Sequence, residues 1–215
     1  MEGEECPGLR KENRVVMPEG VDELALARMM RKLDPNEIRL GLIEAAGFLA
    51  LFELLRAEVI LAPAGLFFDS PPTGTTGDLK FTRFKRGKLV PSKRYREVVL
   101  RGQTEKFDAY ALAASWLASV NAITPSEVAE LLAIRKYRNE VAHELQEILI
   151  DPDRRLRNVF STRASELLAK VGRWGVRNIE LEGESAQIPD EELETGRSIM
   201  AGIVLGGMRR GEDAS

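Results

Sequence analysis

The fold is decided by residues 45–55, which read Ala-Ala-Gly-Phe-Leu-Ala-Leu-Phe-Glu-Leu-Leu. We expect their helix to run from Pro35 to about Ile60, because residues 34–37 combine a capping acid, a proline at the first helical position and a glutamate three residues after the cap. A helix that is apolar almost all round is central in a core or in a membrane. The apolar run is interrupted by charged residues, so it does not reach the roughly 18 uncharged residues of a membrane span. These are Glu44, Glu53, Arg56 and Glu58. We predict a buried central helix and no membrane partner.

The remaining patterns are also mostly helical. We expect a short helix at 21–33 and longer ones at about 104–120, 124–149 and 155–171. Thr124-Pro125-Ser126-Glu127 matches the capping box that begins many helices. The apolar share of 44% and the charged share of 30% are typical of a globular protein. The sequence therefore predicts an all-α fold, a single domain over residues 1–215 with four to five main helices.

Charge is distributed unevenly along the chain. Residues 80–101 hold nine basic side chains and one acidic one, whereas the rest of the chain holds 22 basic against 33 acidic side chains. Residues 180–194 hold seven acids and no base. We expect an irregular basic loop or arm at about 63–103, with a short hairpin within 81–90. An acidic, glycine-dotted C-terminal tail is expected at about 180–215.

The basic segment is a candidate RNA-binding arm, because lysine and arginine neutralise phosphates and aromatic rings stack on unpaired bases. Its aromatic residues are Phe81, Phe84 and Tyr95. The alternatives are a solvated loop and a segment that docks on the acidic stretch 180–194. The candidate RNA-binding residues are Lys80, Arg83, Lys85, Arg86, Lys88, Lys93, Arg94 and Arg96.

Several kinds of site are not expected. Cys6 is the only cysteine, which excludes an internal disulfide and a cysteine-based zinc site. One histidine and scattered carboxylates form no metal-ligand cluster, and the glycine-containing stretch 71–77 lacks the Gly-Lys-Ser/Thr ending of a phosphate loop. We expect no metal and no cofactor. The acidic start, residues 1–5, does not resemble a signal peptide, so a cytoplasmic location is the simplest expectation.

The single histidine ends the string Arg138-Asn139-Glu140-Val141-Ala142-His143, within the helix expected at 124–149. At 100° per residue, Arg138 falls near the middle of an apolar arc, while Asn139 and His143 are four residues apart and share one flank with Arg135 nearby. A buried arginine needs a carboxylate, carbonyls, a second subunit or an anionic ligand. Glu44 and Glu53 are possible internal partners, and a purely structural ion pair is the alternative to a site. The arc consists of Leu131, Ile134, Val141, Ala142, Leu145, Ile148 and Leu149.

These residue types suit one kind of chemistry. In RNA cleavage the 2′-hydroxyl attacks the adjacent phosphorus and the 5′-oxygen leaves. A histidine moves a proton at one of these oxygens. An arginine holds the phosphate and stabilises its added negative charge, while an asparagine orients the imidazole or contacts the phosphate. A two-fold dimer would bring two such sets together.

At these residues the chain resembles the HEPN superfamily of helical-bundle proteins. The family pattern is Arg, then four to six residues, then His, commonly with Asn directly after Arg. The match covers about residues 104–149; residues 63–101 and those after Asp151 lie outside the pattern. Some toxin subfamilies carry a tyrosine two residues after the histidine, where this chain has Leu145.

The resemblance implies a HEPN-like bundle and a metal-independent endoribonuclease, active as a homodimer. Arg138, Asn139 and His143 would form its catalytic site at the dimer interface. Many such proteins are toxins or phage-defence effectors, often beside a nucleotidyltransferase antitoxin. Other members lack nuclease activity, so a non-catalytic RNA-binding or protein-interaction domain is the alternative.

Overall fold

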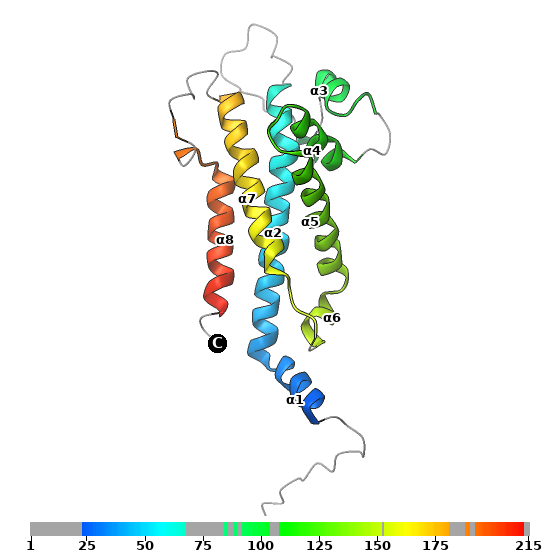
Figure 1. Cartoon of the computed structure of the whole chain (residues 1–215), viewed down its shortest axis with the longest axis vertical. Helices are drawn as coiled ribbons and strands as arrows, with labels where there is room; N and C mark the ends of the chain where they lie inside the picture. Colours follow the sequence, from blue (N-terminus) through cyan, green and yellow to red (C-terminus); the bar gives the residue numbers. More distant parts are fainter. Residues whose placement is uncertain are drawn as a thin grey trace, which may run out of the picture.

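The chain forms a bundle of helices around one long central helix (Figure 1). The structure is a computed structural model. It describes residues 23–67, 84–85, 88–89, 92–103, 108–151, 153–180, 188–189 and 192–212. The all-α class that the sequence predicts is confirmed.

The central helix, α2, spans Pro35–Leu66. Its 32 residues correspond to a length of about 48 Å at 1.5 Å per residue. Asp34 caps its first turn, with a carboxylate oxygen 2.8 Å from the Asn36 amide. Later helices pack around α2: α4 (Ala109–Ser119), α5 (Pro125–His143), α6 (Leu145–Ile150), α7 (Asn158–Gly175) and α8 (Gly196–Glu212).

The core lies along α2 and is closed by aromatic contacts between helices. Phe48 of α2 packs on Tyr137 of α5 with ring centroids 5.0 Å apart, and Tyr137 stacks on Phe160 of α7 at 4.4 Å. Trp116 of α4 meets Trp174 of α7 edge to face at 5.8 Å. Such pairs fix the helices side by side as well as burying apolar area.

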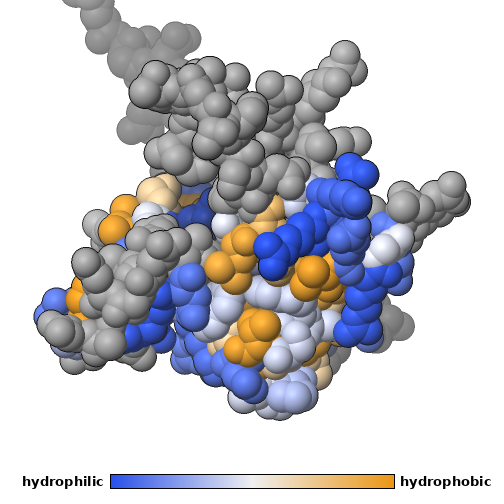
Figure 2. Space-filling model, turned by 90° about the horizontal axis from the view of Figure 1, so that it is seen from above, coloured by the Kyte–Doolittle hydropathy of each residue, from blue (hydrophilic) through white to orange (hydrophobic). Residues whose placement is uncertain are grey.

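Smaller elements lie at the two ends of the bundle. Helix α1 (Glu23–Lys32) extends beyond the lower end of α2 and has no buried residue (Figure 1). The short helix α3 (Lys93–Val98) lies near the upper end (Figure 1). Before it in the sequence, β1 (Phe84–Lys85) and β2 (Lys88–Leu89) form a short antiparallel pair. A π-helical turn, η1 (Val176–Glu180), continues α7. Seen from above, the described surface at this end shows hydrophobic residues set among hydrophilic ones (Figure 2).

Several segments differ from the sequence predictions. The helix expected at 104–120 begins at Ala109, and the helix expected at 124–149 is divided at Glu144 into α5 and α6. Helix α2 continues through Pro63 to Leu66, so the expected basic loop does not begin at residue 63. Pro63 stands in the last turn of α2, where few following residues depend on an unbroken helix, and it is buried. Helix α3 forms within the basic segment, capped by Ser92, which accepts a hydrogen bond from the Tyr95 amide.

The expected C-terminal tail is largely a helix. Residues 196–212 form α8, and Ala201 and Met208 are buried in it. Arg197 of α8 donates to the Glu58 carboxylate of α2 at 2.7 Å, and this carboxylate is buried. Packing against α2 therefore stabilises a helix whose glycines alone would disfavour it. Among the described helices, none is both long enough and apolar enough to span a membrane.

Candidate functional site

Helix α5 carries the Arg-x4-His motif on its last two turns. Its start is the expected capping box, in which the Thr124 hydroxyl accepts from the Glu127 amide at 3.2 Å and the Glu127 carboxylate accepts from the Thr124 amide at 2.7 Å. Most of the predicted apolar arc, which the structure divides between α5 and α6, faces the core, but Ala142 is exposed. That arc is covered by helices of the same chain, so its burial gives no reason for a second subunit.

Arg138 lies at the edge of the core and has an acidic partner. Its guanidinium contacts the Glu53 carboxylate of α2 at 3.2 Å and the Asn139 side-chain oxygen at 3.4 Å. Its Cζ lies 5.7 Å from the centre of the Phe52 ring. The expectation that an internal carboxylate such as Glu53 would pair with Arg138 is confirmed. The Arg138 side chain is still 34% exposed, so an external ligand can reach it.

A groove between α2, α4 and α5 opens beside Arg138. We call it the motif groove; its volume is about 520 Å³. Its lining includes three arginines and two carboxylates, so the groove has a net positive charge. The lining residues are Phe52, Glu53, Arg56, Ile60, Asp108, Ala109, Tyr110, Arg135, Arg138 and Asn139.

Each carboxylate of the motif groove is held by arginine. Glu53 lies between Arg56, at 3.1 Å, and Arg138, at 3.2 Å. Asp108 accepts from Arg135 at 2.5 Å and also caps α4 through the Ala111 amide at 3.1 Å. Partial burial would raise the pKa of Asp108, but the hydrogen bonds from Arg135 and Ala111 outweigh it and leave this pKa lowered. The carboxylate is therefore held in its charged form.

Two polar atoms of the motif groove are buried without a hydrogen-bond partner in the described part of the chain. They are the Tyr110 hydroxyl and Nε of Arg138. Burial raises the pKa of Tyr110 far above its usual value, so its hydroxyl stays protonated and remains able to donate. An unsatisfied buried donor costs about 1 to 3 kcal/mol. Both donors are unused, and because neither atom is accessible to solvent, a ligand would reach them only by displacing a neighbouring side chain.

His143 is the last residue of α5 and is exposed. It follows Asn139 by four residues, about 6 Å along the helix axis, and Asn139 is exposed on the same flank. The motif residues that line the motif groove are Arg138 and Asn139. The imidazole therefore stands one turn beyond the groove, at the junction of α5 with α6.

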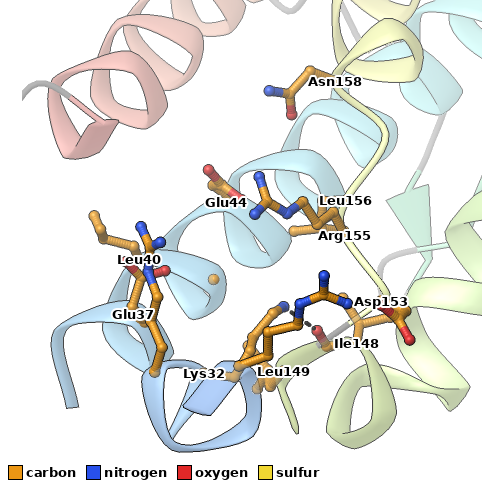
Figure 3. Close-up of a pocket in the computed structure, with 13 residues that line it drawn as sticks. Lys32, Glu37, Leu40, Glu44, Ile148, Leu149, Asp153, Arg155, Leu156 and Asn158 are labelled. Atoms are coloured by element: carbon orange, nitrogen blue, oxygen red, sulfur yellow. Dashed lines mark hydrogen bonds between the residues drawn. The ribbon is translucent and has the colours of Figure 1, made fainter. Parts of the chain in front are cut away.

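A second groove, of about 650 Å³, lies between α1, α2, α6 and the segment that leads into α7. In Figure 3, Lys32 reaches the Ile148 carbonyl and Arg155 extends toward Glu44. The Lys32 amine donates to the Ile148 carbonyl at 3.1 Å and to the Arg154 carbonyl at 2.8 Å. These contacts tie α1 to α6 and occupy the amine, and no motif residue lines this groove. The motif groove is therefore the stronger candidate for a functional site.

The basic segment is only partly described. Lys80, Arg83 and Arg86 lie outside the described residues, as does most of the acidic stretch 180–194, so the expected docking between them falls outside the described part of the chain. Lys85 and Lys88 belong to β1 and β2, while Lys93, Arg94 and Arg96 are exposed on α3. Arg94 lies over the Phe67 ring at 5.8 Å.

Tyr95 does not fit the expected stacking role. It is 2% exposed, packs on Phe67 with ring centroids 6.4 Å apart and directs its hydroxyl to the Ile60 carbonyl at 3.4 Å. Burial raises the pKa of Tyr95 to about 12. The ring holds α3 against the end of α2 and is not free to stack on a base. Of the other two aromatic residues of the basic segment, Phe81 lies outside the described residues and Phe84 belongs to β1.

The sequence predictions missed part of the motif groove. Arg56, Asp108 and Tyr110 line it, but they come from α2 and from the start of α4. One signal was present, since Asp108 followed by an apolar run is a good helix cap. The spacing within α5 carries no information about which residues of other helices come to lie beside it.

Within the part of the chain that the structure describes, no group of three or more His, Cys, Asp or Glu side chains is arranged to hold a metal ion. Comparisons of the chain with family models, with curated proteins and with solved structures gave no match. The assignment of function therefore depends on the residues of the site themselves.

Proposed function

We propose that the chain is a metal-independent endoribonuclease of HEPN type that cleaves RNA through Arg138, Asn139 and His143. The observation that carries the proposal is the placement of Arg138 and Asn139 together in an open groove with a positive charge excess, one helical turn before an exposed His143. A phosphate in the motif groove would be within reach of guanidinium groups, which bind phosphate oxygens in pairs.

The proposed reaction is an internal transfer at phosphorus. The 2′-oxygen forms a bond to phosphorus while the bond from phosphorus to the 5′-oxygen breaks. The products are a 2′,3′-cyclic phosphate and a 5′-hydroxyl. The 2′-hydroxyl loses one proton and the 5′-oxygen gains one, and His143 would carry out one of these transfers. Arg138 would stabilise the charge that develops on the phosphate.

A homodimer remains part of the proposal, because one chain has one histidine and the reaction has two proton transfers. His143 of a second copy would then serve the second transfer. In the cell the enzyme would be a toxin or a phage-defence effector, with a nucleotidyltransferase antitoxin as the expected partner. These biological roles follow from the resemblance of the motif alone.

A non-catalytic HEPN-like domain that binds RNA or a protein is the second candidate. The ion pair between Arg138 and Glu53 favours it, since this contact gives Arg138 a structural role without any ligand.

Cleavage of a labelled single-stranded RNA in the presence of EDTA separates the two candidates. Arg138→Ala and His143→Ala should each lower the cleavage rate by about a hundredfold or more. Arg163→Ala is the matched control. Arg163 is about as exposed as Arg138 and also pairs with a glutamate, Glu130, but it lies away from the motif groove. Equal residual cleavage by the wild type and both motif variants would point to a contaminant and exclude the enzyme.

A further inference from the structure

The two carboxylates of the motif groove occupy positions that suit phosphates. Carboxylate and phosphate oxygens accept the same hydrogen bonds from guanidinium groups. Glu53 is contacted by Arg56 and Arg138 together, and Asp108 by Arg135. The charges of the arginines are thus directed at two points in the groove where an anion is already held.

Each of these points also has one unused donor. At the first, Nε of Arg138 is buried and unpaired although the same guanidinium contacts Glu53. At the second, the Tyr110 hydroxyl is buried and unpaired, and the Arg135 guanidinium lies 5.7 Å from the centre of its ring. A phosphodiester offers more acceptor oxygens than the carboxylate it would replace, so it can satisfy donors that the carboxylates leave unpaired.

We infer that the motif groove binds single-stranded RNA at two phosphates, one on Arg56 and Arg138 in place of Glu53, the other on Arg135 and Tyr110 in place of Asp108. The inference deepens the proposed function and rests on it, since the bound strand is the substrate. A groove of about 520 Å³ has the volume of a site for a drug-sized ligand, which suits one or two nucleotides of a single strand. Glu53 and Asp108 are then internal competitors of the substrate, and Arg56, Arg135 and Tyr110 are positioning residues.

Binding is measured separately from cleavage with a fluorescent ten-nucleotide RNA whose riboses are 2′-O-methylated, because this strand lacks the attacking hydroxyl. Glu53→Gln and Asp108→Asn should each tighten binding roughly threefold to fivefold, the factor expected when a half-exposed ion pair no longer competes. Asparagine can still cap α4 in place of Asp108. Glu130→Gln is the matched control. Glu130 of α5 also pairs with an arginine, Arg163, and its substitution removes the same negative charge at a place outside the motif groove.

Two further variants test the donors. Tyr110→Phe should weaken binding at least threefold without lowering the melting temperature, because the lost hydroxyl has no partner among the described residues. Arg135→Met should reduce the slope of log affinity against log salt by about 0.7, the value for one phosphate contact with a single strand. Arg163→Met should leave this slope unchanged.

The outcomes distinguish the two proposals. If Glu53→Gln and Asp108→Asn bind like Glu130→Gln, if Tyr110→Phe binds like the wild type, or if the wild type does not bind the strand, the two-phosphate inference is overturned. In that case cleavage that depends on Arg138 and His143 would still support the ribonuclease. If the binding order holds but unmodified RNA is not cleaved, the ribonuclease fails and the motif groove stands as an RNA-binding site.

Discussion

Replacing Arg138 with alanine should lower the free energy of unfolding by only about 1 to 2 kcal/mol, although the residue lies within the apolar arc of α5. The ion pair with Glu53 joins side chains that are 34% and 48% exposed. A pair this exposed contributes about 0.2 to 1 kcal/mol. The contact with the Phe52 ring, at 5.7 Å, adds about 0.5 to 1 kcal/mol. Loss of the unpaired Nε works in the opposite direction, because that buried donor is unfavourable in the folded state.

Urea unfolding followed by far-ultraviolet circular dichroism measures this change, with the slope against urea as a check that the same surface is exposed. A double-mutant cycle with Glu53→Gln should give a coupling energy of at most about 1 kcal/mol. A loss of more than about 3 kcal/mol, the range of a broken buried ion pair, would refute the reasoning. It would mean that Arg138 is primarily structural. A small loss makes Arg138→Ala a folded variant, so its effect on RNA cleavage can be assigned to the site.

The other predictions concern stability. Arg197→Ala should lower the free energy of unfolding, measured in urea, by about 2 to 3 kcal/mol, because it leaves the 6% exposed Glu58 carboxylate without its partner. The loss is below that of a fully buried pair, because the Arg197 side chain is partly exposed to water. The pKa of Asp108 is lowered in the folded state, so its stabilisation is complete above the ordinary aspartate pKa of about 3.9 and is lost as pH falls below it. The melting temperature of Asp108→Asn should accordingly fall less than that of the wild type as the pH is lowered through this range. An identical fall would contradict the lowered pKa of Asp108. Gly202→Ala should stabilise α8 by about 0.5 to 1 kcal/mol, since no described atom lies within 4 Å of the added Cβ. Gly47→Ala should destabilise by about 1 kcal/mol or more, because its Cβ would lie 2.6 Å from a methionine side chain; equal melting temperatures for the two alanine variants would refute this contrast.

Local signals predicted the helix starts well. The capping box at Thr124 and the acid–proline pair at Asp34 and Pro35 both form as expected, because they depend only on residues within one turn. Helix α8 was not predicted, since the glycines at 202, 206 and 207 disfavour a helix locally and its stabilisation comes from α2. Pro63 was taken as a break for the same reason: the tertiary environment that tolerates it is not visible in the neighbouring residues.

In the candidate site, too, the local features could be predicted from the sequence and the features that depend on tertiary packing could not. The spacing of Arg138 and Asn139 predicted neighbouring side chains on one helix, and the search for a carboxylate among the charges of the central helix found Glu53. Tyr110 and Asp108 lie 25 or more positions before Arg135 and Arg138 in the sequence, and only the packing of α4 against α5 brings them into the motif groove. The buried, unpaired Tyr110 hydroxyl is a tertiary property that no sequence spacing encodes.

The central position of α2 has a consequence for the order in which the chain is made. Residues 35–66 are synthesised before every helix that covers them, from α4 to α8. At the usual elongation rates of about 5 to 20 residues per second, the interval before Met208 can close over Gly47 is on the order of 10 s. During this interval the face of α2 that α8 covers lacks its native partner, even after α4 to α7 have been made. Nascent chains should therefore depend on a chaperone or on transient self-pairing until α8 emerges, and chains interrupted before α8 should be the ones that aggregate.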